Sequence, residues 1–301
     1  MTLSRGTHDR PAWRADLALV GVALIWGATF VLVKQALQDA STVLFLALRF
    51  SLAALALAVA FRPLASKLAP PRTLLAGGAL AGLCLSAGYL FQTVGLRYTS
   101  PSKSAFITGL SIVMVPVFGA AWRRQLPVAA EVLGVLAATA GLGLMTLNPE
   151  TLRIERGDLL TLACAVAFAA HLLVVGHYAP RVSFEALALV QVATAAVLGL
   201  GACWWVEPPL IRWTPGVIVA LIVTGLLATA LAFSVQAWAQ QYTTPTHTAL
   251  IFALEPVFAW LTSYLLAGEL LSLRVSLGAG LILAGILLVE LKPFGGGQRP
   301  R

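Results

Sequence analysis

The stretch YTSPSKSAFI at residues 98–107 returns 144 residues later as YTTPTHTALI at residues 242–251. In both copies a Tyr-Thr-x-Pro junction opens an apolar segment. The same offset of 144 aligns Gln92, Gly134 and Gly141 with Gln236, Gly278 and Gly285, and an offset of 142 aligns Asp16, Trp26 and Arg49 with Asp158, Phe168 and Gln191. Chance resemblance between small-residue helices would not keep these matches in register. The pattern therefore predicts an internal repeat.

The composition excludes a soluble globular protein. Hydrophobic residues make up 59% of the 301 residues and charged residues only 11%, with a mean hydropathy of +0.89. Soluble domains carry about 25% charged residues. The net charge of +8 is spread between apolar runs, which indicates membrane orientation rather than nucleic-acid binding. The three cysteines lie inside apolar runs, so neither a disulfide framework nor a metal site is expected.

The apolar runs are long enough to cross a bilayer, which takes about 20 residues of helix. Between Pro, Gly and charged residues, the sequence offers ten candidates: 15–37, 43–61, 73–97, 101–122, 128–147, 157–179, 184–205, 214–241, 245–267 and 272–291. We expect cytoplasmic tails at 1–14 and 293–301, a first repeat at 15–149 and a second at 150–292. The expected fold is all-α, with ten transmembrane helices.

The distribution of Lys and Arg predicts the orientation. With the N-terminus inside, cytoplasmic segments hold 12 of these residues and the opposite side holds 7, while Arg49 lies within a helix. This bias favours both termini in the cytoplasm. Five helices per repeat is an odd number, so the second repeat enters the membrane from the opposite side. Inverted repeats around a central cavity are typical of alternating-access transporters.

Several motifs resemble the EamA family of the drug/metabolite transporter superfamily. They are Trp26-Gly27-Ala28-Thr29-Phe30, Leu48-Arg49-Phe50, Leu254-Glu255-Pro256-Val257-Phe258 and Gly268-Glu269. The resemblance implies that helices 1, 3, 4, 6, 8 and 9 line a central cavity, that helices 5 and 10 brace it, and that no ATP or prosthetic group is used. The first repeat departs from this pattern: Pro116 lies four residues later than the equivalent of Pro256, and Arg124-Gln125 replaces Gly-Glu.

Glu255 is the sharpest site candidate. It lies about ten residues into its apolar segment, where a carboxylate costs about 2.5–3.5 kcal/mol even on the translocon insertion scale. It could carry a proton, hold a substrate ammonium group, or act as a structural acid for backbone groups freed by Pro256. Pro116 and Pro256 are the expected helix breaks.

Neutral polar and aromatic side chains complete the expected cavity. Tyr89 and Gln92 share one helix face, and Gln236 is the repeat equivalent of Gln92. They could bind a polar substrate or join helices by hydrogen bonds. Further candidates for substrate contact are Trp26, Thr108, Trp238 and Phe252.

Besides Glu255, His171 and Arg49 are ionisable residues that lie away from the ends of the apolar segments. His171 could join Glu255 in proton coupling or contact substrate, or it could be a neutral histidine bonded within the bundle. We expect Arg49 to be mainly structural and to extend toward the outer face near Lys34 and Asp39. Lys103 and His247 occupy matching places at helix starts, where they could act as gates.

The sequence therefore predicts a non-enzymatic secondary transporter in the cell membrane. The expected substrates are small metabolites, amino acids first, moved by alternating access, with protons as the candidate coupling ion. The alternatives are a broad exporter of organic cations and, less favoured, a passive channel or scramblase. The expected partners are the small-molecule substrate and the lipid bilayer, with no cofactor and no nucleic acid.

Overall fold

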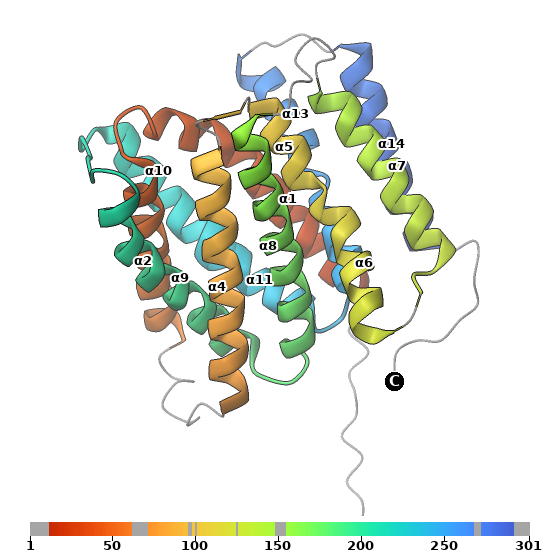
Figure 1. Ribbon diagram of the computed structural model, residues 1–301, viewed down its shortest axis with the longest axis horizontal. Helices are drawn as coiled ribbons and strands as arrows, with labels where there is room; N and C mark the ends of the chain where they lie inside the picture. Colours follow the sequence, from red (N-terminus) through yellow and green to blue (C-terminus); the bar gives the residue numbers. More distant parts are fainter. Residues whose placement is uncertain are drawn as a thin grey trace, which may run out of the picture.

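The computed structural model describes residues 12–61, 72–95, 98–99, 101–124, 126–147, 155–267 and 272–291, and within these ranges it is built of helices (Figure 1). The helices are α1 (Ala12–Ala36), α2 (Thr42–Ala60), α4 (Arg72–Gly95), α5 (Pro101–Gly109), α6 (Ser111–Arg123), α7 (Ala129–Thr146), α8 (Arg156–Tyr178), α9 (Phe184–Val206), α10 (Pro215–Gly225), the π-helical turn η2 (Leu226–Leu231), α11 (Ala232–Ala239), α12 (Pro245–Phe252), α13 (Glu255–Ala267) and α14 (Leu273–Leu291). Each predicted apolar segment is helical. Of the predicted terminal tails, only residues 12–14 are described, and they belong to α1.

Two of the predicted segments are broken helices. The first breaks at Leu110, between α5 and α6, and the second at Ala253 and Leu254, between α12 and α13. Leu110 and Leu254 are 144 residues apart, the offset of the sequence repeat. The two breaks therefore fall at equivalent positions of the two repeats. A third irregularity is the π-turn η2 between α10 and α11.

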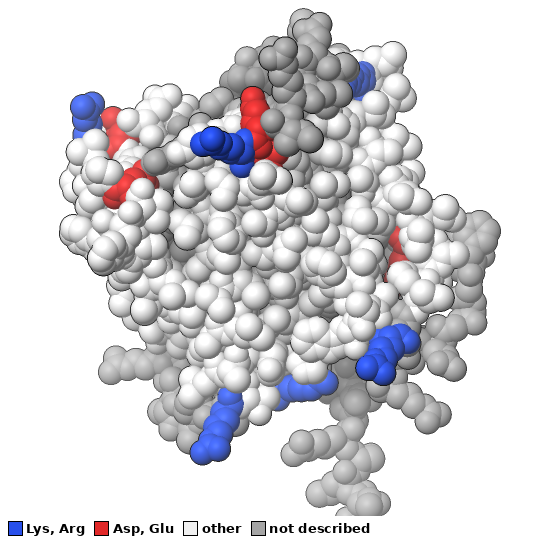
Figure 2. All heavy atoms as spheres, viewed as in Figure 1, with Lys and Arg blue, Asp and Glu red and all other residues white. Residues whose placement is uncertain are grey.

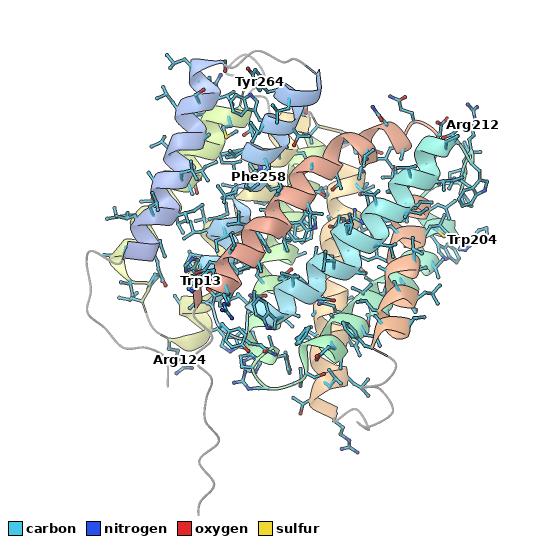
Figure 3. The ribbon with its side chains drawn as sticks, turned by 180° about the vertical axis from the view of Figure 1, so that it is seen from behind. Trp13, Arg124, Trp204, Arg212, Phe258 and Tyr264 are labelled. Carbon is cyan, nitrogen blue, oxygen red and sulfur yellow. The ribbon has the colours of Figure 1, made fainter. Side chains whose placement is uncertain are left out.

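The outer surface of the helix assembly suits a lipid environment. Within the described residues, seven helical stretches are long and apolar enough to cross a membrane, and Leu273–Val289 of α14 forms a shorter apolar helix. Figure 2 shows that Lys and Arg side chains on the viewed face gather at its upper and lower ends, with a largely uncharged surface between them. Trp13 and Arg124 lie at one end of the molecule and Arg212 at the other (Figure 3). These residues lie at opposite ends, as the predicted orientation requires.

The helices pack in two groups. One apolar core joins α2, α4, α8 and α9 with part of α11, and another joins α1, α7, α12 and α14. In the second group, α7 and α14 approach through glycines, Gly134 against Gly285 and Gly141 against Gly278. The residue numbers of these contacts rise along α7 as they fall along α14, so the two helices are antiparallel. Because Gly134 and Gly141 are the repeat equivalents of Gly278 and Gly285, each contact is the repeat image of the other.

The broken helices contact one another near one end of the assembly. Near Trp13 and Arg124, α12 packs against α6 and α8. This contact is sealed by an apolar cluster that includes Val115 of α6, Leu172 of α8 and Ala249 of α12. Toward the opposite end, α13 packs mainly against α1. The two ends of the α5–α6 and α12–α13 segments are therefore packed differently.

Candidate functional site

Trp26 of α1 lies at the centre of a group of aromatic side chains. Its ring centroid is 4.8 Å from that of Phe252 and 5.7 Å from that of Phe233. Its indole Nε1 donates a hydrogen bond of 2.8 Å to the carbonyl oxygen of Ala228, in the π-turn η2. The half-buried ring therefore has a fixed orientation, and it joins α1 to η2, α11 and α12.

Arg49 of α2 is buried inside the helix assembly, which corrects the expectation that it extends toward Lys34 and Asp39. Only 5% of the residue is exposed. Its Nε donates to Thr229 Oγ1 at 2.7 Å and its Nη2 donates to the Ala228 carbonyl at 3.1 Å. The side chain turns inward because η2 provides two neutral acceptors, so this cation reaches partners without crossing the apolar layer to water.

Tyr89 of α4 forms the second aromatic group. The Arg49 guanidinium carbon lies 5.4 Å from the centroid of the Tyr89 ring, within the range of a cation–π contact. Tyr89 also meets Phe50 and Phe168 edge to face, at centroid distances of 5.3 and 5.5 Å. The Tyr89–Phe168 pair is the repeat equivalent of the Phe233–Trp26 pair, at offsets of 144 and 142. The two repeats thus contribute matching aromatic pairs.

Glu255 is the first residue of α13 and lies directly after the helix break. Its side chain is half-buried and within electrostatic range of Arg49 and Tyr89. Within the described part of the chain, the carboxylate makes no hydrogen bond and no ion pair. The backbone there is tightly packed, since a β-carbon on Gly27 of α1 would lie 2.7 Å from the Glu255 carbonyl oxygen. The backbone of Glu255 is therefore packed closely against α1.

Gln92 and Thr108, two of the predicted cavity residues, contact one another. Gln92 Nε2 donates to Thr108 Oγ1 at 3.3 Å, and Thr108 Oγ1 lies 3.8 Å from Cys164 Sγ. These contacts join α4, α5 and α8 just before the break at Leu110. The side chains of Gln92 and Thr108 are half-buried.

His171 of α8 is bonded within the bundle. Its Nε2 lies 2.8 Å from Gln191 Oε1 of α9, and its ring meets Phe233 edge to face at 5.8 Å. Only 3% of His171 is exposed. Of the two readings left open by the sequence, this geometry favours a neutral histidine that orders the wall behind Phe233.

Gln236 and Trp238 make their contacts elsewhere in α11. Gln236 Nε2 donates to Gln240 Oε1 at 3.2 Å, and Gln240 Nε2 in turn donates to the Leu172 carbonyl at 3.0 Å. Trp238 contacts Tyr242 with a centroid distance of 5.6 Å. Gln236 therefore bonds to Gln240, which in turn bonds to α8, whereas Gln92 bonds to Thr108. Symmetric positions in the sequence have different partners here.

The two predicted helix breaks differ in their relation to proline. Pro256 is the second residue of α13, where its missing N–H is tolerated. Pro116 lies inside α6, whereas the break of that segment is at Leu110. The Leu110 N–H bonds to both Phe106 and Ile107 carbonyls, which tightens the last turn of α5. The first break is therefore made by a tightened turn and not by Pro116.

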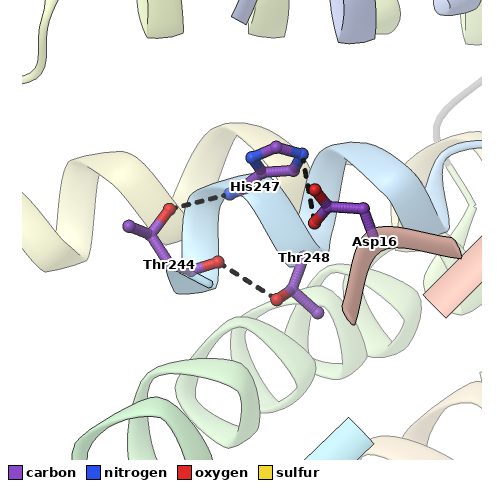
Figure 4. Close-up of polar contacts among 4 residues, drawn as sticks. All are labelled: Asp16, Thr244, His247 and Thr248. Atoms are coloured by element: carbon purple, nitrogen blue, oxygen red, sulfur yellow. Dashed lines mark hydrogen bonds and ion pairs between the residues drawn. The ribbon is translucent and has the colours of Figure 1, made fainter. Parts of the chain in front are cut away.

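His247, one of the predicted gate residues, joins α12 to α1. Its Nε2 lies 3.6 Å from Asp16 Oδ1 (Figure 4). The first turn of α12 is capped by Thr244, whose Oγ1 accepts from the His247 N–H and whose carbonyl accepts from Thr248 Oγ1. The side chain of Lys103, the equivalent residue of the first repeat, lies outside the described residues. Asp158, the equivalent of Asp16, accepts instead from Thr99 Oγ1 at 2.5 Å.

Among the described residues, no group of three or more His, Cys, Asp or Glu side chains is placed to hold a metal ion. The central side chains come from α1, α2, α4, α8, η2, α11 and the breaks beside α5 and α13. Sequence reasoning missed Phe233, Thr229 and the Ala228 carbonyl. The offset of 144 from Tyr89 could have identified Phe233, whereas a backbone carbonyl carries no sequence signal.

An all-helical assembly with an uncharged belt and polar groups at broken helices defines a multi-pass membrane protein of the transporter type. The chain belongs to the EamA-like transporter family, whose profile matches it twice, over residues 13–147 and 155–291. The family assignment and the predicted multi-pass membrane location are thereby confirmed.

Individual relatives agree along the whole chain. A protein of Archaeoglobus fulgidus named "Uncharacterized transporter" is 33% identical over 92% of this chain and 86% of its own length. The Bacillus subtilis protein "Uncharacterized transporter YvbV" is 26% identical over 94% of this chain and 93% of its own. A solved structure titled "Crystal structure of protein" is 21% identical and superposes with a TM-score of 0.78 over 94% of this chain and 99% of that one. The superposition supports the fold.

Proposed function

We propose that this transporter moves small metabolites that carry an amino group, with amino acids first, as a secondary transporter that works by alternating access. The observation that carries the proposal is the Glu255 carboxylate, half-buried at a helix break and without an ion-pair partner among the described residues. A carboxylate inside a membrane protein is costly unless it has a function or a partner. A substrate ammonium group would supply that partner during transport.

The charges around the site favour a positively charged substrate group over a negative one. The only other charged side chain described within electrostatic range of Glu255 is Arg49. Its guanidinium already donates to Thr229 and Ala228 and lies over Tyr89. Arg49 therefore offsets the charge of Glu255 at a distance, without covering the carboxylate.

Alternating access is supported by the relation between the repeats. The antiparallel α7 and α14, and the equivalent breaks at Leu110 and Leu254, are what two inverted five-helix repeats would produce. In such a fold α6 is the repeat equivalent of α13, and α12 is the repeat equivalent of α5. A contact between α6 and α12 in one state therefore corresponds to a contact between α13 and α5 in the other. The described state packs α6 on α12 at the end that carries Arg124, while α13 packs mainly on α1. We infer a state closed toward the cytoplasm and open toward the outside.

A second candidate, a broad exporter of organic cations, is favoured by the aromatic rings next to the carboxylate. The ring centroids of Trp26 and Phe252 are 4.8 Å apart, and an ammonium or aromatic cation could lie against the faces of these rings. The two candidates share the same Glu255 chemistry. They differ in the size of the molecule and in whether a substrate carboxylate is required.

Counterflow in proteoliposomes tests the proposal. Vesicles loaded with one unlabelled amino acid at a time should accumulate the labelled compound, in saturable fashion, if that amino acid is a substrate. Saturable exchange of cationic dyes, without exchange of amino acids, would select the second candidate. Flux that does not saturate would favour a channel or scramblase, and an absence of exchange for every solute and dye would reject a carrier of amines.

A further inference from the structure

The carbonyl oxygen of Ala228 is shared by donors from two different helices. It accepts from Trp26 Nε1 of α1 at 2.8 Å and from Arg49 Nη2 of α2 at 3.1 Å. These residues are separated from Ala228 by 202 and 179 positions in the sequence. The shared acceptor is therefore a three-helix junction, formed by α1, α2 and η2.

The π-turn makes this carbonyl available. In an α-helix the Ala232 N–H would bond to the carbonyl four residues earlier, that of Ala228. Here the Ala232 N–H bonds to the carbonyls of Leu227 and Thr229. The Ala228 carbonyl is released from the helix ladder, and a released carbonyl in an apolar interior needs a donor from outside the helix. Trp26 and Arg49 provide that donor.

The neighbouring hydroxyl extends the junction. Arg49 Nε donates to Thr229 Oγ1 at 2.7 Å, and Thr229 Oγ1 donates in turn to the Thr224 carbonyl at 2.8 Å, five residues back. The guanidinium thus engages two adjacent acceptors on the π-turn with two nitrogens. A planar guanidinium can donate from two nitrogens to two adjacent acceptors, whereas the ammonium of a lysine has only one nitrogen.

Arg49 also reaches the other aromatic group. Its guanidinium carbon is 5.4 Å from the Tyr89 centroid, and Tyr89 packs edge-on against Phe168 and Phe50. The same side chain therefore contacts the π-turn that holds Trp26 and the ring of Tyr89. Tyr89 is within electrostatic range of Glu255, and Gly27, the residue after Trp26, packs against the Glu255 backbone.

We propose that Arg49 is a positioning residue of the transport site, which holds the Ala228–Thr229 π-turn and thereby sets the positions of Trp26 and Tyr89 around Glu255. It contacts no substrate itself. The proposal rests on the proposed function in one respect only, namely that the aromatic rings of Trp26 and Tyr89 are positioned for substrate. The junction itself can be tested without transport.

Fluorine NMR provides that test. The chain contains eight tryptophans, so protein labelled with 5-fluorotryptophan in detergent gives a small set of resonances, and W26F assigns the Trp26 signal by its loss. The informative variants are R49K, which keeps the charge without the fork, and T229V, which removes one acceptor at nearly constant volume. T224V is the matched control, because the Thr224 hydroxyl is equally buried but donates to the Ala220 carbonyl of its own helix.

We expect the Trp26 resonance to shift or broaden in R49K and T229V and to stay in place in T224V, with the other tryptophan signals unchanged. An unmoved Trp26 signal in T229V would overturn the proposal even if R49K does not fold. For any solute that shows counterflow, T229V should raise KM about threefold to tenfold with little change in maximal rate, and T224V should not. If no solute exchanges but the Trp26 signal responds, the positioning role stands and the proposed function fails.

Discussion

Gly141 of α7 and Gly278 of α14 pack so closely that a β-carbon on Gly141 would lie 2.4 Å from the Gly278 carbonyl oxygen, and one on Gly278 would lie 2.6 Å from the Gly141 carbonyl oxygen. The obstacle on both sides is backbone, which cannot rotate away as a side chain can. Close approach of this kind lets membrane helices gain van der Waals contact without a hydrophobic driving force. The relation makes α7 and α14 a rigid pair.

We therefore predict that G141A destabilises the protein by about 1–3 kcal/mol, the usual cost of overpacking. The free energy of unfolding in mixed detergent and sodium dodecyl sulfate micelles measures it. The control is G280A, on the partner helix α14, where an added β-carbon would have no neighbour within 4 Å. That control should be neutral or slightly stabilising, since alanine is the better helix former. Equal losses for both variants would contradict the close approach.

A second prediction concerns the pair formed by His171 and Gln191, 2.8 Å apart in the bundle. H171L or Q191L alone leaves a buried polar partner unsatisfied, at a cost of about 1–3 kcal/mol. The double variant removes both polar groups and should cost less than the sum, with a coupling energy of about 0.6–1.7 kcal/mol. Unfolding free energies of the four proteins complete the cycle.

Ser86 supplies a reference for that cycle. Its hydroxyl is buried and has no hydrogen-bond partner among the described residues, so S86A should cost nothing measurable.

Additive losses in the His171–Gln191 cycle would show that the two side chains are not coupled. They would also show that His171 is not held as the structure describes.

The extent of the helices could be predicted from the sequence because each apolar run has the length that a bilayer requires. The junction at the Ala228 carbonyl could not be predicted from the sequence. Its acceptor is a backbone atom, and it becomes available only because η2 departs from α-helical hydrogen bonding. For the same reason Arg49 was expected to extend outward, since nothing near it in the sequence offers a partner. Gln236 was assigned by symmetry with Gln92, but its contact is local, with Gln240 four residues on.

A third prediction separates the readings of Glu255. E255Q keeps the shape of the side chain and removes its charge. If the carboxylate serves a substrate ammonium, counterflow should fall at least about tenfold, the factor of a 1.4 kcal/mol interaction, while unfolding stability stays the same or rises, because burying a charge is costly. If Glu255 is a structural acid, stability should fall and transport should survive in the folded fraction.

E185Q is the matched control for that substitution. Glu185 lies in the first turn of α9 and is also half-buried. Its change should leave counterflow intact, so an equal loss in E185Q and E255Q would remove the special role of Glu255. Both variants are measured in the same vesicles, with the amount of folded protein determined by gel filtration in detergent.

A fourth prediction follows from the packing of the broken helices. Ala249 of α12 is 1% exposed, within the apolar cluster shared with α6 and α8, at the end that we infer to be closed and cytoplasmic. Its repeat equivalent, Ala105 of α5, is exposed. In two inverted repeats these positions exchange environments when access alternates. With Cys84, Cys164 and Cys203 replaced by alanine, A105C should therefore react with a membrane-impermeant maleimide added from outside, and A249C should not.

Adding a transported solute should change this pattern in opposite directions, lowering the labelling of A105C from outside and raising that of A249C in inside-out vesicles. Ala138 of α7 is fully buried in the pair with α14, so A138C should stay unlabelled in every condition. The prediction fails if solute does not change the labelling of A105C and A249C while counterflow is active in the same vesicles. That result would contradict a transport cycle in which the α6–α12 contact and the α5–α13 contact close in turn. A reciprocal response would tie the sequence repeat to the transport cycle, because the two positions share nothing except their register.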